Sequence, residues 1–114
     1  NGTKKAKQNP FDFVKKIQKL GIGEIIINSI DNDGVMKGYD FKLFDAFRDI
    51  INTPMTILGG AGSLNDIESA IKRYKTIGVS AGSLFVFKGK YKAVLINYPS
   101  KKERKKLYGL NKLV

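Results

Sequence analysis

Three short apolar runs constrain the fold of this chain more than any other feature. They cover residues 24–28, 55–58 and 76–81, and each is followed by a loop of glycine and small polar residues and then by a helical pattern. Near-continuous apolar runs are typical of parallel strands that are covered on both faces. Repeated strand–helix units predict a parallel α/β sheet, either doubly wound or closed into a (β/α)₈ barrel. A barrel needs about 250 residues, so three units would form only a piece of one.

Amphipathic helical patterns lie before and between these runs. Asn9-Pro10 is a start signal for the first helix, and Gly21 marks its end. Ser63 is a good N-cap for the third helix, with Asp66 as a weaker capping-box partner than Glu. The expected helices cover residues 11–20, 41–51, 63–74 and, as a short helix, 84–87.

The C-terminal part of the chain is expected to be less regular. Residues 93–96 are apolar and fit either a strand or a helix, and Pro99 ends that segment before a charged tail. We therefore expect one partial barrel domain over residues 1–114, with a loop at 1–10 and a basic tail at 99–114.

The loop Ser29–Asp40 follows the first apolar run, and its first half contains two carboxylates and a glycine, Asp31, Asp33 and Gly34. Asp, Asn and Gly favour turns on their own, so the stretch is also typical of an ordinary turn. Its place at the carboxyl end of a buried strand favours an active-site loop. Asp31 and Asp33 are therefore candidate catalytic residues, although the pattern assigns neither a definite role.

Two glycine-rich turns follow the second and third runs. Gly59-Gly60-Ala61-Gly62-Ser63 lies between a strand and a helix, where backbone N–H groups and the helix dipole favour an anion. It has neither the Gly-Lys-Ser/Thr ending of a Walker A loop nor the glycine spacing of the dinucleotide fingerprint. Tight packing is the alternative explanation. Because Ala81-Gly82-Ser83 follows the next run, the pair predicts a phosphate site of the kind that barrels build after their last two strands.

The net charge of +11 lies in the flanks of the chain. Residues 1–20 carry +5 and residues 88–114 carry +8, whereas residues 21–87 carry −2. Basic flanks can bind nucleic acid phosphates, but they can equally be solvated or face an acidic partner. They lack the interleaved aromatic residues of a single-strand platform, so nucleic acid is not the expected partner.

The amino-acid composition also excludes several kinds of catalytic and metal-binding site. The chain has no Cys and no His, which excludes disulfides, thiolate chemistry, imidazole catalysis and the common zinc sites within it. No metal and no cofactor are expected. No apolar run is long enough to span a membrane, and no signal peptide is visible, although the first residue is not Met. A reducing, cytoplasmic setting fits this composition.

Taken together, the motifs resemble the C-terminal half of the cyclase subunit of imidazole glycerol phosphate synthase, over roughly residues 11–87. The resemblance rests on five stretches in the same order and with similar spacing: Glu24–Asp31, Asp33-Gly34, Gly38–Asp40, Gly59–Ser63 and Ala81–Phe85. It implies a (β/α)₈ barrel that binds a substrate with two phosphate ends. It also implies a glutaminase partner that supplies ammonia, with which the enzyme cleaves and cyclises the substrate.

The resemblance assigns the three runs to barrel strands 6, 7 and 8. The family's two catalytic aspartates lie after strands 1 and 5, outside this chain, so the chain alone is expected to have no cyclase turnover. Asp31 and Asp33 are implied to line the mouth, and Ser29 to orient the substrate. The implied phosphate-binding residues are Asp33, Gly34, Gly59, Gly60, Gly82 and Ser83. Gly60→Val is expected to abolish phosphate binding with little change in helix content.

Several positions depart from the usual cyclase pattern. Asn28 and Val35 stand where the family usually has Thr, and Leu58 stands where Ser is usual. The stretch 87–99 also differs from the family's usual last helix. It is similar to a divergent branch encoded with surface-polysaccharide genes, in which the barrel is thought to pass ammonia to a sugar amidination enzyme. The alternative function is therefore an ammonia-delivery subunit.

An incomplete barrel also predicts self-association. Its outer strands would have unpaired edges, which recruit other chains. The inward faces of 25–27, 55–58 and Val79 would form an open apolar patch. The alternative is that residues 93–96 fold over the open side and cover it.

Overall fold

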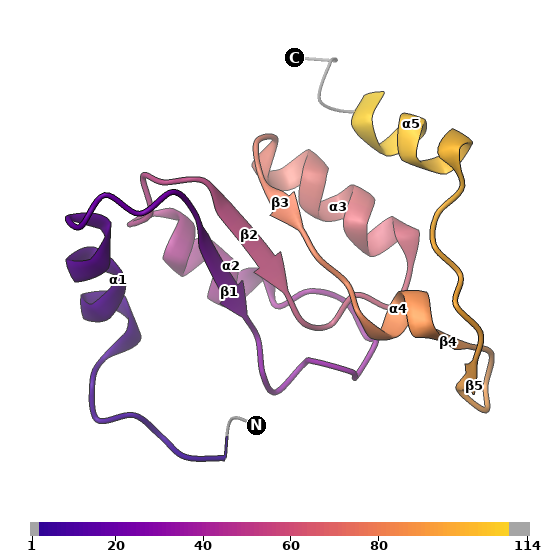
Figure 1. Cartoon of the computed structure of the whole chain (residues 1–114), viewed down its shortest axis with the longest axis horizontal. Helices are drawn as coiled ribbons and strands as arrows, with labels where there is room; N and C mark the ends of the chain where they lie inside the picture. Colours follow the sequence, from indigo (N-terminus) through magenta and orange to yellow (C-terminus); the bar gives the residue numbers. More distant parts are fainter. Residues whose placement is uncertain (1–2, 110–114) are drawn as a thin grey trace.

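The computed structural model describes residues 3–109 and contains a parallel sheet of three strands. The strands are β1 (Ile25–Asn28), β2 (Met55–Leu58) and β3 (Gly78–Val79), in that spatial order (Figure 1). The first two pair over their whole length, from Ile25 opposite Met55 to Asn28 opposite Leu58. All three strands were predicted, but β3 is shorter than the predicted run 76–81. The predicted parallel α/β class is confirmed.

Five helices lie within the described residues 3–109, together with a small antiparallel hairpin. The helices are α1 (Pro10–Gln18), α2 (Phe41–Arg48), α3 (Leu64–Tyr74), α4 (Ser83–Val86) and α5 (Lys101–Gly109). The hairpin consists of β4 (Phe87–Lys88) and β5 (Ala93–Val94). Helices α1 to α4 correspond to the four helical patterns in the sequence, with ends that differ by a few residues. None of the described helices is long and apolar enough to cross a membrane.

Capping side chains explain where two of these helices begin. The Asn9 side chain accepts hydrogen bonds from the Phe11 and Asp12 amides, and Pro10 occupies the first turn of α1. At α3, Ser63 and Asp66 form a complete capping box, in which Asp takes the place that Glu usually has. Both starts were predicted, because a capping residue and its target amide are only a few residues apart in the chain.

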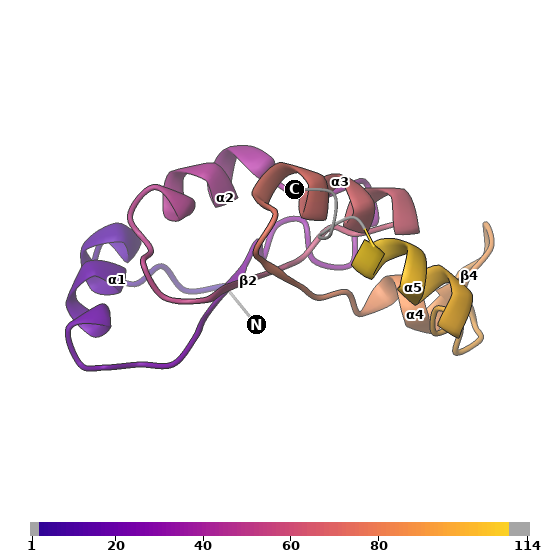
Figure 2. The same ribbon diagram turned by 90° about the horizontal axis from the view of Figure 1, so that it is seen from above.

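Helices α2 and α3 cover one face of the sheet and leave the other face open (Figure 2). Phe44 of α2 and Met55 and Ile57 of β2 are fully buried between these layers. Along β1, Ile25 is buried whereas Ile26 is 61% exposed, because successive side chains of a strand point to opposite faces. The expectation that the inward faces of 25–27 and 55–58 lie open concerns the face turned away from the helices, and Ile26 on that face is exposed as expected.

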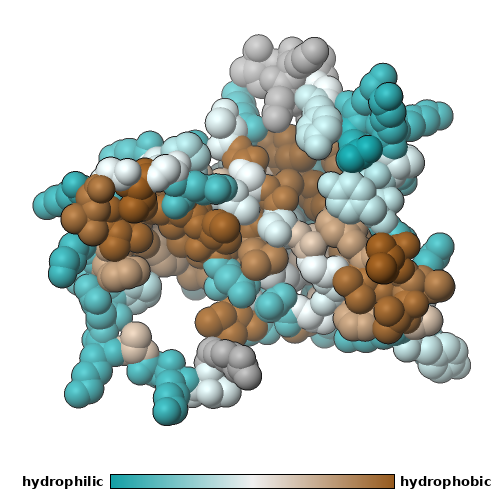
Figure 3. Space-filling view, viewed as in Figure 1, coloured by the Kyte–Doolittle hydropathy of each residue, from teal (hydrophilic) through white to brown (hydrophobic). Residues whose placement is uncertain are grey.

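The open face includes Ile26 and Thr56, which pair across β1 and β2. An apolar groove of about 390 Å³ runs between α1 and the outer edge of β1, lined by Phe13, Ile17 and Ile26 among others. The space-filling view shows apolar side chains gathered there and again over β4 and β5 (Figure 3).

The C-terminal part differs from the sequence prediction in two ways. Residues 93–96 form β5 and its continuation, but they project from the molecule and do not cover the open face of the sheet (Figure 1). After Pro99, the predicted charged tail contains helix α5, whose Leu107 is buried in the core. A single apolar position in a basic segment is a weak sequence signal, which is why this helix was not predicted. Residues 110–114 of that tail lie outside the described part of the chain.

Candidate functional site

Three loops meet at the carboxyl end of the sheet. The Ser29–Asp40 loop leaves β1 and passes over the glycine turn that follows β2, with the Gly38 amide donating to the Gly60 carbonyl over 2.8 Å. It also approaches the turn after β3, because a Cβ placed on Gly34 would lie 3.7 Å from Ser83 Oγ. Predicted site residues from all three loops are therefore brought together.

Gly59 and Gly60 allow these loops to pack closely. Both have positive φ angles, 98° and 111°, which L side chains rarely adopt. A Cβ on Gly59 would lie 2.5 Å from the Ser29 carbonyl oxygen, and one on Gly60 would overlap the Gly38 carbonyl. The two glycines therefore serve backbone packing, which was the alternative explanation for this turn. Gly60→Val would disturb that packing, so it is not a clean test of anion binding.

The N-terminus of α3 is already occupied by a carboxylate. Asp66 Oδ2 accepts hydrogen bonds from the amides of Gly62 and Ser63, each 2.9 Å long, and from Ser63 Oγ over 3.0 Å. An anion at this end of α3 would have to compete with that carboxylate. The sequence indicated that Asp66 is a capping partner, but it did not indicate that the Asp66 carboxylate would compete with a bound anion.

Other loop amides have no acceptor among residues 3–109. They include the backbone N–H groups of Gly34, Gly59, Gly60 and Gly82. Gly82 differs from the two packed glycines, because a Cβ placed on it would meet no atom within 4 Å. This loop position is open, and Ser83 beside it carries a hydroxyl. Helix α4, which begins at Ser83, has only four residues and adds little dipole.

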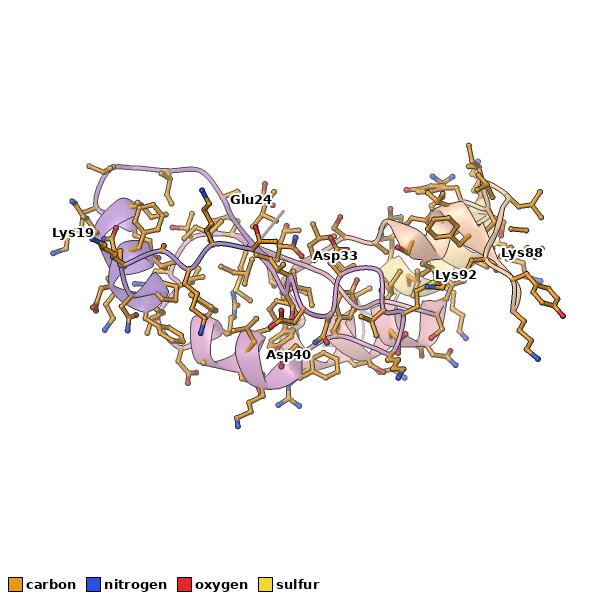
Figure 4. The ribbon with its side chains drawn as sticks, turned by 90° about the horizontal axis from the view of Figure 1, so that it is seen from below. Lys19, Glu24, Asp33, Asp40, Lys88 and Lys92 are labelled. Carbon is orange, nitrogen blue, oxygen red and sulfur yellow. The ribbon has the colours of Figure 1, made fainter. Side chains whose placement is uncertain are left out.

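Ser29, Asp31 and Asp33 lie in different environments. Ser29 is buried, and its carbonyl accepts hydrogen bonds from the Asn32 and Asp33 amides over 3.0 and 2.9 Å. Asp31 and Asp33 are exposed on the same loop, and Figure 4 shows Asp33 on the loop above the start of α2, which Asp40 caps. The residues 3–109 contain no cluster of His, Cys, Asp or Glu that could hold a metal ion.

Tyr39 anchors the end of this loop, a role that the sequence did not indicate. Its hydroxyl donates to the Ser80 carbonyl over 2.8 Å, which links the β1–α2 loop to the residue just after β3. The ring is buried against Phe44, with centroids 6.2 Å apart. Burial, and secondarily the negative charge of Asp66, raise the pKa of the Tyr39 hydroxyl, which therefore stays protonated as a donor. The sequence feature that could have indicated this anchor is the aromatic residue directly after Gly38.

The fold and site define an α/β protein with glycine-containing loops at the carboxyl end of a parallel sheet. A family model described as "Histidine biosynthesis protein" matches residues 1–92. The chain belongs to this family.

Relatives with curated names extend the comparison. The chain is 58% identical over 106 residues to "Putative imidazole glycerol phosphate synthase subunit hisF3" of Vibrio vulnificus, a match covering 93% of this chain and 41% of that protein. It is 55% identical over 108 residues to "Putative imidazole glycerol phosphate synthase subunit HisF" of Leptospira interrogans, covering 95% of this chain and 42% of that protein.

A third relative carries the unqualified name. The chain is 35% identical over 85 residues to "Imidazole glycerol phosphate synthase subunit HisF" of Pseudoalteromonas translucida, covering 75% of this chain and 33% of that protein. The chain thus spans about two fifths of the length of the first two relatives and a third of this one.

Proposed function

We propose that this chain is the C-terminal part of a cyclase-type (β/α)₈ barrel, with β1, β2 and β3 as barrel strands 6, 7 and 8. Its three loops would hold one phosphate end of a bis-phosphate substrate in histidine biosynthesis. The observation that carries the proposal is the meeting of the Ser29–Asp40 loop with the turns after β2 and β3, with the Gly34 and Gly82 amides lacking acceptors among residues 3–109.

In this proposal, backbone groups bind the phosphate. The amides of Gly34 and Gly82 and the Ser83 hydroxyl would donate to its oxygens, since hydrogen bonds to an ionised acceptor are stronger than neutral ones. Asp33 would fix the shape of the loop, because its amide already donates to the Ser29 carbonyl over 2.9 Å and its carboxylate would repel a phosphate. Asp31 and Asp33 would orient uncharged parts of the substrate at the mouth, and buried Ser29 would act mainly by shaping the loop.

The chemical step is ammonia-dependent cleavage and ring closure, a lyase-type reaction with a glutaminase subunit as the ammonia source, in the cytoplasm. The acid–base carboxylates that the family places after strands 1 and 5 are outside this chain, and each such group contributes a factor of about 10² to 10⁴. We therefore expect the purified chain to give no turnover with ammonia and the bis-phosphate substrate, with the Pseudoalteromonas translucida protein as the positive control. Steady product formation by the chain alone would contradict the fragment proposal.

Phosphate binding is tested by calorimetric titration of inorganic phosphate into the chain. Ser83→Ala removes one donor and should weaken binding about 10- to 100-fold, the effect of one hydrogen bond to a charged group. Gly82→Val should abolish binding, because it fills the open loop position. The matched control is Ser69→Ala, an exposed position on α3, with affinity unchanged. If all three variants bind equally well, with a steep salt dependence, phosphate binds to the basic flanks instead.

The ammonia-delivery function is the second candidate, favoured by where the departures from the cyclase pattern lie. Asn28 and Leu58 are paired neighbours on β1 and β2, next to the site loops. Asn28 is exposed, and neither side chain belongs to the buried core between the sheet and its helices. In a closed barrel this face would line the interior, so both departures would change the cavity. Assaying the full-length protein for cyclase turnover, and for ammonia transfer to a sugar amidination enzyme, separates the two functions.

A further inference from the structure

The β4–β5 hairpin is the most exposed apolar feature of the described chain. Phe87 pairs with Val94, and the pairing continues through the Leu95 amide, which donates to the Val86 carbonyl over 2.9 Å. Despite these bonds, the hairpin side chains are not covered. Their exposed fractions are 90% for Tyr91, 70% for Val94, 56% for Leu95 and 85% for Ile96. An ordered hairpin with adjacent exposed aliphatic side chains indicates an interaction surface.

The same hairpin is strongly basic. Lys88, Lys90 and Lys92 lie in or beside its turn, and residues 69–102 contain no Asp or Glu. Among residues 3–109, none of the three lysines forms an ion pair. Figure 4 shows Lys88 and Lys92 on the projecting end of the molecule, opposite Lys19 and α1.

We propose that this hairpin is a docking surface for a partner protein that presents acidic side chains around an apolar recess. The lysines would face the acidic rim, and Val94, Leu95 and Ile96 would enter the recess. Complementary charge of this kind sets the association rate and the choice of partner, whereas apolar burial supplies affinity. This proposal does not depend on phosphate binding.

The positions of the lysines and aliphatic residues argue against three other binding partners of the hairpin. In a hairpin that inserts into a membrane the aliphatic residues would form the tip, but here the turn 89–92 contains Lys90 and Lys92, and the aliphatic residues lie nearer the body. A single-strand platform would need several aromatic residues for base stacking, whereas Tyr91 is the one aromatic residue in the hairpin turn and residues 94–96 are aliphatic. A second copy would place like charges opposite each other.

The position of the hairpin suggests what docking would do. It follows directly from α4, which begins at Ser83 of the candidate site, and it lies at the end of the sheet toward which the strands point (Figure 1). The family model ends at residue 92, before β5, whereas the Vibrio vulnificus match covers 106 of the 114 residues and so includes the hairpin. The partner would therefore sit beside the site mouth, on a feature that the family model does not fully contain.

The first experiment uses the full-length protein in the cells that produce it. A photo-crosslinking amino acid replaces Tyr91, and the control position is exposed Lys72 on α3. We expect one protein adduct at position 91 that is absent at position 72, identified by mass spectrometry. Adducts only with copies of the same protein, with lipid or with nucleic acid, or no adduct above the control, would overturn the proposal.

The second experiment measures binding of that purified partner. Combined Lys88→Glu, Lys90→Glu and Lys92→Glu, and separately Ile96→Ser, should each weaken binding at least tenfold, and affinity should fall with salt. The control for the charge variant is Lys101→Glu, Lys102→Glu and Lys105→Glu together, which changes the net charge by the same amount on α5. The control for the apolar variant is Leu20→Ser, at a position where the side chain is 75% exposed. Both should change affinity less than twofold. Equal losses in the controls would show that the hairpin is not the docking surface.

Discussion

At the scale of single residues, the glycines of this site have different roles. Gly60 is buried with a φ of 111°, and a Cβ there would overlap the Gly38 carbonyl. Gly82 has a negative φ and open space around it. Glycine alone in a sequence does not distinguish these cases, because the same residue permits both tight packing and an open loop.

This difference predicts that a glycine-to-alanine substitution lowers stability at one of these positions and hardly changes it at the other. Gly60→Ala should lower the free energy of unfolding by about 2 kcal/mol, because the new side chain meets both an unfavourable φ and a backbone clash. Gly82→Ala should change it by less than about 0.5 kcal/mol, as for an open surface position. Urea unfolding followed by circular dichroism measures both. Equal stability of the two variants would show that Gly60 is not packed as described.

At the scale of elements, α2 and α3 are joined by a polar contact beside the core. Asp45 of α2 accepts hydrogen bonds from Arg73 Nε and from the Tyr74 hydroxyl, each over 2.8 Å, and forms an ion pair with Arg73. The hydrogen bond from Arg73, followed by that from Tyr74, holds the pKa of Asp45 at about 2. Burial, and secondarily the bond to Asp45, raise the pKa of Tyr74 to about 12.

This contact predicts a pH-dependent effect of Asp45→Asn. Because the folded-state pKa of Asp45 is below its ordinary value of 3.8, ionised Asp45 stabilises the fold above about pH 4, and this contribution is lost as the pH falls toward 2. Asp45→Asn should therefore lower Tm by a few degrees at pH 7, and the difference should shrink at pH 3. Thermal melts at both pH values measure this. Asp49→Asn, at the end of α2, is the control and should show a smaller change.

At the scale of the whole molecule, the sheet is open on one face and at its outer edge. The helices cover a single face, and the groove beside β1 is apolar (Figures 2 and 3). Residues 93–96, which were the alternative cover for the open face, project away from the sheet and stay exposed. Unpaired strand edges and open apolar surface both favour contact with another chain.

We therefore predict that the chain self-associates at micromolar concentration, measured by light scattering. Association should strengthen with salt, because screening reduces repulsion between chains that each carry +11. Ile26→Lys, on the open face at the edge strand, should shift the equilibrium toward monomer without loss of helix content. Leu20→Lys, at an equally apolar exposed position outside the sheet, should not. A stable monomer with hydrogen-exchange protection in all three strands would refute this prediction.

The sequence by itself determined the elements from α1 to α4, because their signals are local, but not the β4–β5 hairpin or α5. Apolar runs placed β1 and β2, and Asn9 and Ser63 cap the helices that they were predicted to start. Only the tertiary structure decided which partners the loop amides and side chains contact, because those contacts join residues that are far apart in the chain. Asp66 occupies the start of α3, Tyr39 reaches Ser80, and the aliphatic segment 93–96 stays exposed. Periodicity and spacing carry no information about which distant backbone group a side chain or glycine will meet.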